Sequence, residues 1–166
     1  MEEDKKIVLG EDQTLTLEIY DAKGNKTGEK LEFDMGDIDL PLRYQELLAQ
    51  DKKNRETLRN KMLVLEKKPD APGEGAMTRN QEEQVRALVE FFKKEVEVYN
   101  LFLGENGVQK LLNGRKLRWE TLEEIDSIID KQIRPYIEVD TKRMIDKVKK
   151  AYGRKDEPEE EIETLE

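Results

Sequence analysis

The chain has 166 residues, of which 42% are charged and 36% hydrophobic, and its formal net charge is −9. It contains no Cys and no His, which excludes thiolate and imidazole metal sites and every catalytic pair that uses a His base. The acidic balance argues against nucleic acid or an anionic membrane as the main partner, and the high charge content predicts long solvated helices.

The strand signal lies between residues 6 and 34. A short apolar run stands at 7–9, and alternating apolar residues mark two longer strands at 15–20 and 30–35. The turn between them, 21–28, is rich in Gly, Asn and Asp. We expect a β-hairpin with one apolar face, which must pack on helices because an isolated hairpin is only marginally stable.

A helical segment is expected after the hairpin. Asp39 is a candidate N-cap ahead of Pro41, which is tolerated in the first helical turn. Apolar residues at helical spacing fit one long helix or two shorter ones, and they are Leu40, Tyr44, Leu47, Leu48, Leu58, Met62 and Leu65. The next segment, 67–77, holds two Pro and two Gly and predicts an exposed, mobile connector.

The most densely apolar stretch runs from Thr78 to Gly114 and is expected to carry the main core. Thr78 and Gln81 form a capping-box pattern, and Gly104 stands where a helix stop is expected. One helix face carries Val85, Leu88, Val89, Phe92, Val96, Tyr99 and Leu103. A second face adds Phe91, Val98, Leu101 and Phe102. A helix that is apolar on two sides either packs in a core or binds a partner, and the residues leave both possibilities open.

Three shorter segments complete the predicted helices. One or two turns at 105–112 are closed by Asn113 and Gly114. A further helix carries Leu122, Ile125, Ile129 and Ile133 in register. Thr121 and Glu124 offer it a possible second capping box, and Pro135 is expected to kink or end it. The last helix is expected over 140–152, capped by Asp140.

These elements predict an α+β fold that is mostly α, with an N-terminal β-hairpin followed by a bundle of about five helices. We divide the chain into the hairpin with the first helical segment (1–66), the connector (67–77), a helical core (78–153) and an acidic tail (154–166). The tail holds seven acidic and two basic residues beyond Gly153, and this charge density predicts disorder.

No catalytic, metal or cofactor site is predicted. Paired carboxylates are frequent, but they lie on faces that water should reach, where nothing raises their pKa. Asp34, Asp37 and Asp39 lack the spacing of a calcium loop and are interpreted as turn and cap residues. The basic run around Trp119 has two interpretations: a solvated helix entry with the Trp in the core, or a surface that faces a partner.

The order of these features resembles small proteins from the tail-assembly region of long-tailed, siphovirus-type phages and prophages of Gram-positive bacteria. The phrase FDMGDIDLPLRYQELL comes first, and an aromatic helix then ends in FLGENGVQKLLNGRK. In such proteins an aromatic helix runs into FGEGxSxKLFGxR. The matching residues here are Phe102, Gly104, Glu105, Lys110, Leu111, Gly114 and Arg115. The resemblance is loose over most of the chain and best over 99–116, where Leu103 interrupts the Phe-Gly pair.

This resemblance implies a tail assembly chaperone. Such proteins are non-enzymatic, associate with themselves in a spiral, and bind the tape-measure and tail tube proteins during assembly. They act in the host bacterial cytoplasm and are absent from the mature virion. The alternative is a structural virion component or another phage-encoded protein-interaction module. No cofactor, nucleic acid or membrane is expected. The residues predicted to take part in protein interactions are Phe91, Phe102, Leu103, Leu111, Arg115 and Trp119.

Overall fold

The computed structural model describes residues 13–153. The predicted strand at 7–9 and the acidic tail at 154–166 lie outside the described residues. The elements in chain order are β1 (Thr14–Tyr20), β2 (Lys26–Asp34), α1 (Leu40–Lys67), α2 (Arg79–Leu103), α3 (Gly107–Leu112), α4 (Trp119–Ile128), the π-helical turn η1 (Ile129–Ile133) and α5 (Arg134–Tyr152).

The two strands form the predicted antiparallel hairpin. Leu15 lies opposite Phe33 and Leu17 opposite Leu31, so the alternating apolar residues share one face. The Asp21 side chain accepts hydrogen bonds from two backbone amides of the turn, as turn chemistry predicts. The apolar face packs on the helices, where the ring of Phe33 lies 5.4 Å from the ring of Phe102.

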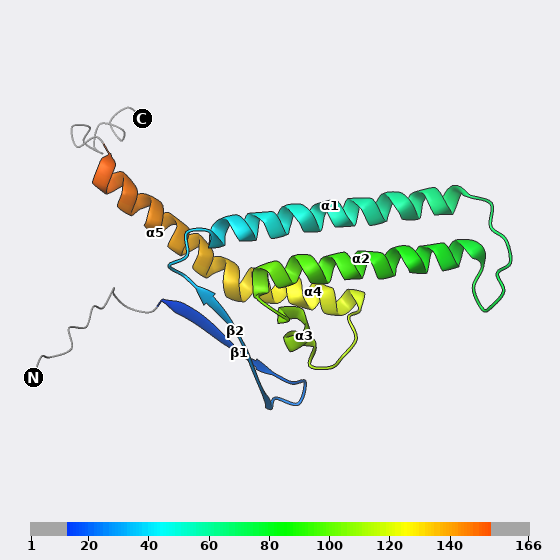
Figure 1. Ribbon diagram of the computed structural model, residues 1–166, viewed down its shortest axis with the longest axis horizontal. Helices are drawn as coiled ribbons and strands as arrows, with labels where there is room; N and C mark the ends of the chain where they lie inside the picture. The colour runs from blue at the N-terminus through cyan, green and yellow to red at the C-terminus, as the bar shows by residue number, and fades with distance from the viewer. Residues whose placement is uncertain (1–12, 154–166) are drawn as a thin grey trace, which may run out of the picture.

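Helices α1 and α2 lie side by side as a long antiparallel pair (Figure 1). The first helical segment is therefore one helix and not two. Asp39 occupies the N-cap position, but its side chain makes no capping hydrogen bond. The carboxylate of Asp37 instead accepts a hydrogen bond from the backbone N–H of Asp39. It also forms an ion pair with Arg43 at 2.7 Å. The connector between the helices is anchored by Asn80, whose side chain donates to two carbonyls at the end of α1.

The capping box of α2 is confirmed. The backbone N–H of Gln81 donates to the Thr78 hydroxyl at 3.2 Å, and the Gln81 side chain accepts from the backbone N–H of Thr78 at 3.0 Å. The helix ends at Gly104, whose φ of 100° is a conformation that L side chains rarely adopt. The predicted boundaries of the central helix therefore follow from its two end residues.

The buried face of α2 differs from the predicted one. Val85 and Val89 were expected in the core, but both are exposed. The buried residues of this helix are Ala87, Phe91, Glu95, Tyr99, Phe102 and Leu103. Glu95 therefore lies in the middle of the buried face of α2. The pattern of apolar residues does not reveal this face, because a carboxylate interrupts it.

Helix α3 packs closely under the end of α2. Gly107 begins it, and a Cβ on Gly107 would stand 2.5 Å from the Cβ of Leu103. Asn113 closes the helix with a positive φ of 49°, as the sequence predicts for the Asn-Gly pair. Val108 and Leu112 complete the core on this side.

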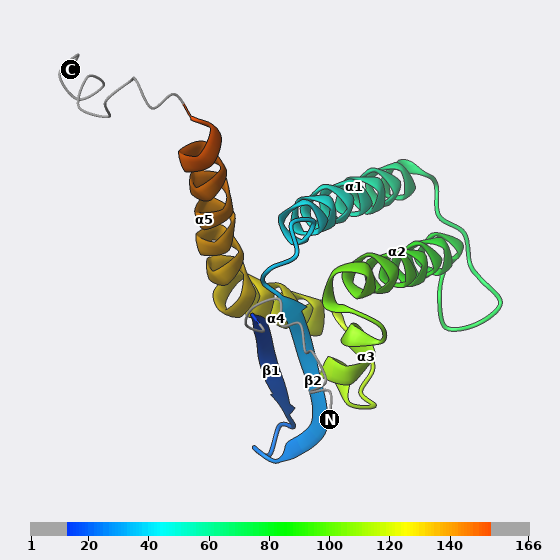
Figure 2. The ribbon, with the colours of Figure 1, turned by 60° about the vertical axis from the view of Figure 1, so that its left-hand side comes forward.

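Helix α4, the turn η1 and α5 form one continuous helix (Figure 1). Pro135 was expected to kink or end this helix, with a new helix starting at 140. The helix does not end there, but α5 runs at an angle to α4 (Figure 2). The backbone N–H of Arg134 donates to the Ile129 carbonyl, five residues earlier. Pro135 follows directly after this turn and has no N–H to donate to the preceding part of the helix. The π turn thus lets the helix continue through the proline.

Two predicted caps in this region are also wrong. Helix α4 begins at Trp119 without a side-chain cap, so Thr121 and Glu124 lie inside the helix. Asp140 is buried in the middle of α5 and forms an ion pair with Arg143. The predicted apolar register of Leu122, Ile125, Ile129 and Ile133 is confirmed, since all four are buried.

The predicted fold class is confirmed. The hairpin precedes a helical bundle, and one core cluster joins residues from both strands and all the helices. Because α4, η1 and α5 are continuous, the described part of the chain contains four helices where about five were predicted. Within residues 13–153, no helix combines the length and apolar character needed to cross a membrane.

Candidate functional site

A polar cluster lies inside the helical bundle where α1, α2 and α4 meet. Arg55 of α1 donates to Asp51 and to Asp126 of α4, both at 2.9 Å. The hydroxyl of Tyr99 on α2 donates to the other oxygen of the same Asp126 carboxylate. Asn54 donates to Glu95 of α2 at 3.0 Å. Side chains of three helices are therefore tied together by charge-assisted hydrogen bonds.

Glu95 is the most deeply placed member of this polar cluster. It has no solvent-exposed surface, and its Oε2 is the one fully buried side-chain polar atom without a partner among residues 13–153. Burial, followed by the neighbouring Asp51 carboxylate, raises the pKa of Glu95 to about 8. Asn54 and Arg55 oppose this shift only in part. At neutral pH Glu95 is therefore mainly a neutral acid.

The other acids and the phenol of the polar cluster respond to the same surroundings. Burial is the main cause that raises the pKa of Asp126, with Tyr99 and Arg55 acting in the opposite direction. Burial and the Asp126 carboxylate raise the pKa of Tyr99, which stays a neutral hydrogen-bond donor. The donors of the polar cluster therefore bind its own acceptors, and these contacts hold α1, α2 and α4 together.

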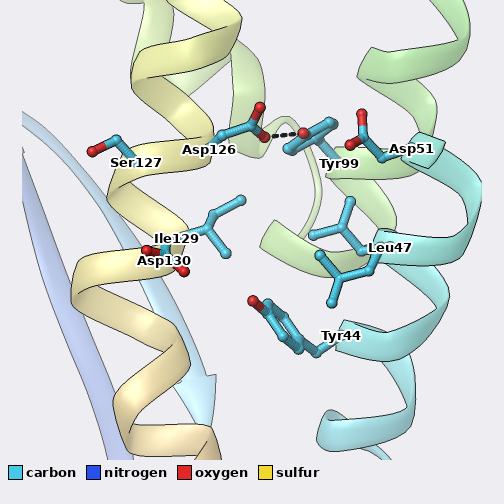
Figure 3. A pocket seen from close by; sticks show the side chains of 9 residues that line it. Tyr44, Leu47, Asp51, Tyr99, Asp126, Ser127, Ile129 and Asp130 are labelled. Atoms are coloured by element: carbon cyan, nitrogen blue, oxygen red, sulfur yellow. Dashed lines mark hydrogen bonds between the residues drawn. The ribbon is translucent and has the colours of Figure 1, made fainter. Parts of the chain in front are cut away.

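A pocket of about 440 Å³ opens beside the polar cluster, between α1 and the α4–η1 segment. We call it the inner pocket. Figure 3 shows Leu47 and Tyr44 on the α1 side, facing Ile129 and Asp126 across the gap. The remaining lining residues are Leu48, Asp51, Tyr99, Ser127 and Asp130. Its walls are apolar and its rim is acidic, and Leu48 at the rim is 46% exposed.

Helix α5 borders two further pockets. One, of about 620 Å³, lies between α5 and the start of α1 and is lined in part by Leu42, Ile137 and Ile145. The other, of about 570 Å³, lies between α5 and the end of the hairpin, and we call it the hairpin–α5 pocket. Its lining residues are Gln13, Met35, Pro135, Tyr136, Val139, Asp140 and Arg143.

The hairpin–α5 pocket exposes apolar side chains to solvent, and polar contacts of Arg143 hold its walls in place. Val139 is 71% exposed and Tyr136 is 54% exposed. Arg143 connects the two walls of the pocket, because its guanidinium donates to Gln13 at 3.0 Å and pairs with the buried Asp140 of α5. Exposed apolar side chains gathered in a concave surface are typical of a protein-interaction site.

Three of the residues predicted to take part in interactions lie in the core. Phe91, Phe102 and Leu103 are all buried, and the ring of Phe102 contacts Phe33 and Tyr44. In this conformation they present no free surface to a partner. The sequence left open whether this helix packs in a core or binds a partner, and the structure places these three side chains in the core.

The other three predicted residues are partly accessible. Trp119 is 38% exposed and stacks on Phe91 at 5.8 Å, while the Arg55 guanidinium lies 5.3 Å from the Trp119 ring. Leu111 and Arg115 both line a small pocket beside the hairpin, which shares no lining residue with the hairpin–α5 pocket. The six residues thus do not form one surface.

The described residues contain no group of three or more His, Cys, Asp or Glu side chains placed to hold a metal ion. Comparison with known proteins gave no matching family model, no matching curated protein and no matching solved structure.

Proposed function

We propose that the chain is a non-enzymatic tail assembly chaperone of a long-tailed phage or prophage of Gram-positive bacteria. It associates with itself and binds the tape-measure and tail tube proteins while the tail is built. It acts in the host bacterial cytoplasm and is absent from the mature virion. The family assignment rests on the sequence resemblance over 99–116.

The observation that carries the binding role is the hairpin–α5 pocket. Val139 and Tyr136 expose apolar surface there, and Met35 and Pro135 extend it. An amphipathic helix matches this surface, because its apolar side chains enter the pocket while its polar face stays in water. Tape-measure proteins present long helices of this kind, so we assign the pocket to a tape-measure helix.

Co-expression with a helical tape-measure segment tests this proposal. The parent chain is expected to carry the segment into the soluble fraction, since burial of its apolar face removes the surface that drives aggregation. Val139→Asp should abolish this effect, because it places a charge in the apolar contact. Val89→Asp is the matched control, since Val89 is also an exposed valine but lies on α2.

Two outcomes would refute the proposed binding role. One is a segment that stays insoluble with the parent chain. The other is a Val139→Asp variant that solubilises the segment as well as Val89→Asp does, which would place the contact elsewhere. Circular dichroism of both variants shows whether each retains the helical content of the parent.

A further inference from the structure

The continuous helix formed by α4, η1 and α5 carries opposite charges at its two ends. From Trp119 to Asp130 it holds five acidic residues and no basic one. From Lys142 to Lys150 it holds five basic residues and one acidic one. A basic segment of this density stands out in a chain whose net charge is −9, and opposite charges on separate surfaces favour an encounter between two copies.

The basic end of α5 also carries an apolar stripe. Every residue from Ile145 to Tyr152 is exposed, and in both ribbon views the C-terminal end of α5 extends away from the other helices (Figures 1 and 2). Ile145 and Lys149 also line the pocket of about 620 Å³ beside the start of α1. Ile145, Val148 and Tyr152 are spaced by three and four residues, so they share one helix face. Lys142 and Lys149 lie beside that face. We call these five residues the arm.

The lysines of the basic end have no charge partner within the described chain. Lys142, Lys147, Lys149 and Lys150 form no ion pair there, and Arg143 pairs only with Asp140. The arm thus combines unpaired positive charge with exposed apolar surface. Its complement is a surface that is apolar at the centre and acidic at the edge.

The inner pocket has that composition. Leu47, Leu48 and Ile129 line its apolar part, and its acidic residues are Asp51, Asp126 and Asp130. Asp51 and Asp126 already pair with Arg55, whereas Asp130 lies exposed at the surface. Its volume of about 440 Å³ falls in the range of roughly 300–1,000 Å³ that is usual for ligand pockets. The α4 end of the continuous helix carries further acidic residues.

Three carboxylates at that end are also available to a partner. Glu120, Glu123 and Glu124 are exposed and form no ion pair with another described residue. Glu123 accepts a hydrogen bond from the Trp119 indole, and Glu124 lines the small pocket beside the hairpin. Asp130 pairs with Arg134 near the surface. Exposed pairs of this kind contribute little stability, so Asp130 can accept a lysine from a second molecule at small cost.

The arm cannot reach the inner pocket of its own chain. Both lie on one continuous helix, and the 18 residues from Asp130 to Val148 span roughly 27 Å at 1.5 Å per residue. The helix would have to break and fold back for the arm to contact its own α4. The complementary surfaces therefore meet only between molecules.

We propose that the arm of one copy docks in the inner pocket of a second copy. The contact is head-to-tail, since the arm and the inner pocket are different surfaces of each molecule, and such a contact builds an open chain unless its rotation closes a ring. This inference deepens the self-association that forms part of the proposed function, and it rests on that function.

Sedimentation velocity over a concentration series, with three variants, tests the contact. The arm variant combines Val148→Asp with Lys149→Glu, and the pocket variant is Leu48→Lys. All three positions are exposed, so the core is untouched. Lys147→Glu is the matched control, because Lys147 lies on the opposite side of α5 from the stripe.

The parent and the control should grow beyond the dimer as concentration rises. The arm variant and the pocket variant should each need about tenfold higher concentration or more to associate, because each loses an apolar contact and gains a repulsive charge. An equimolar mixture of the two variants should form a one-to-one complex and stop there. The mixture contains one intact arm and one intact pocket per pair, which suffices for a single contact.

Association of the arm variant at the concentration that suffices for the parent would overturn the inference. A mixture that stays monomeric, or that grows beyond the dimer, would overturn it as well. These outcomes leave the tape-measure binding of the proposed function intact. Failure of the parent to solubilise the tape-measure segment would refute that function while leaving the arm contact measurable.

Discussion

Glu95 lies in the middle of the buried face of α2, although its side chain is the least apolar on that face. A single sequence offers no reason to place an acid in a core, because buried charge is costly. The structure resolves this conflict with Asn54, which donates to one carboxyl oxygen, and with a raised pKa that leaves Glu95 neutral. The polar cluster was therefore missed by sequence reasoning. Its one sequence signal is an acid in phase with Phe91 and Tyr99.

The titration of Glu95 predicts a specific dependence of stability on pH. In the folded protein Glu95 keeps its proton up to about pH 8, whereas in the unfolded chain it loses the proton near its ordinary pKa of 4.5. Between these values the unfolded state binds fewer protons, so the free energy of unfolding falls as pH rises. The decline from Glu95 is complete above pH 8.

Glu95→Gln should remove this part of the decline. Relative to the parent, the variant is expected to gain on the order of 3 kcal/mol between pH 5 and pH 8. Urea unfolding at four pH values across this range measures the difference. Glu97→Gln, an exposed glutamate on the same helix, should follow the parent. Parallel profiles for the parent and Glu95→Gln would show that Glu95 is ionised in the fold.

Phe91 lies on the observed core face of α2, whereas Phe92 belongs to the face that the sequence predicted to be buried. Phe91 is fully buried, and Phe92 only packs against the edge of the core. Phe91→Ala should lower the free energy of unfolding by about 3–5 kcal/mol, since it leaves a cavity. Phe92→Ala should cause a smaller loss. Denaturant unfolding of both variants decides between the faces, and a larger loss at Phe92 would restore the predicted face.

At the scale of elements, the sequence predicted what neighbouring residues determine. The hairpin, the capping box at Thr78 and Gln81, and the helix stop at Gly104 each depend on local chemistry, and all three are confirmed. The course of the chain at Pro135 was missed, because it depends on the η1 turn. A π turn is rare and has no simple sequence pattern, so the sequence indicated a kink or a helix end at Pro135 and a separate last helix from residue 140.

The close packing of α3 under α2 gives a prediction at the same scale. Gly107→Ala would place a Cβ 2.5 Å from the Leu103 Cβ, so the backbone of α3 must shift. We expect a loss of about 1–3 kcal/mol in the free energy of unfolding. Gly75→Ala is the control, because its Cβ would meet nothing within 4 Å. Equal thermal midpoints for the two variants would contradict the close packing.

At the scale of the whole molecule, the sequence predicted the balance of strand and helix but not the surfaces. Phe91, Phe102 and Leu103 looked available for a partner, and the fold uses them in its core. Tyr136, Val139 and Val148 were not predicted to be surface residues, and the fold leaves them exposed on α5. Exposure depends on how long-range packing directs each helix, which a local pattern does not contain.

The central claim is that this chain holds tail proteins during assembly and then leaves them. Mass spectrometry of affinity-tagged chain in the bacterium that encodes it tests this claim most directly, in cells building phage tails and in purified finished particles. We predict that the chain is recovered with the tape-measure protein from the cells and is absent from the particles. Recovery of the chain in finished particles, at a fixed ratio to the tube protein, would contradict the claim and identify a structural component.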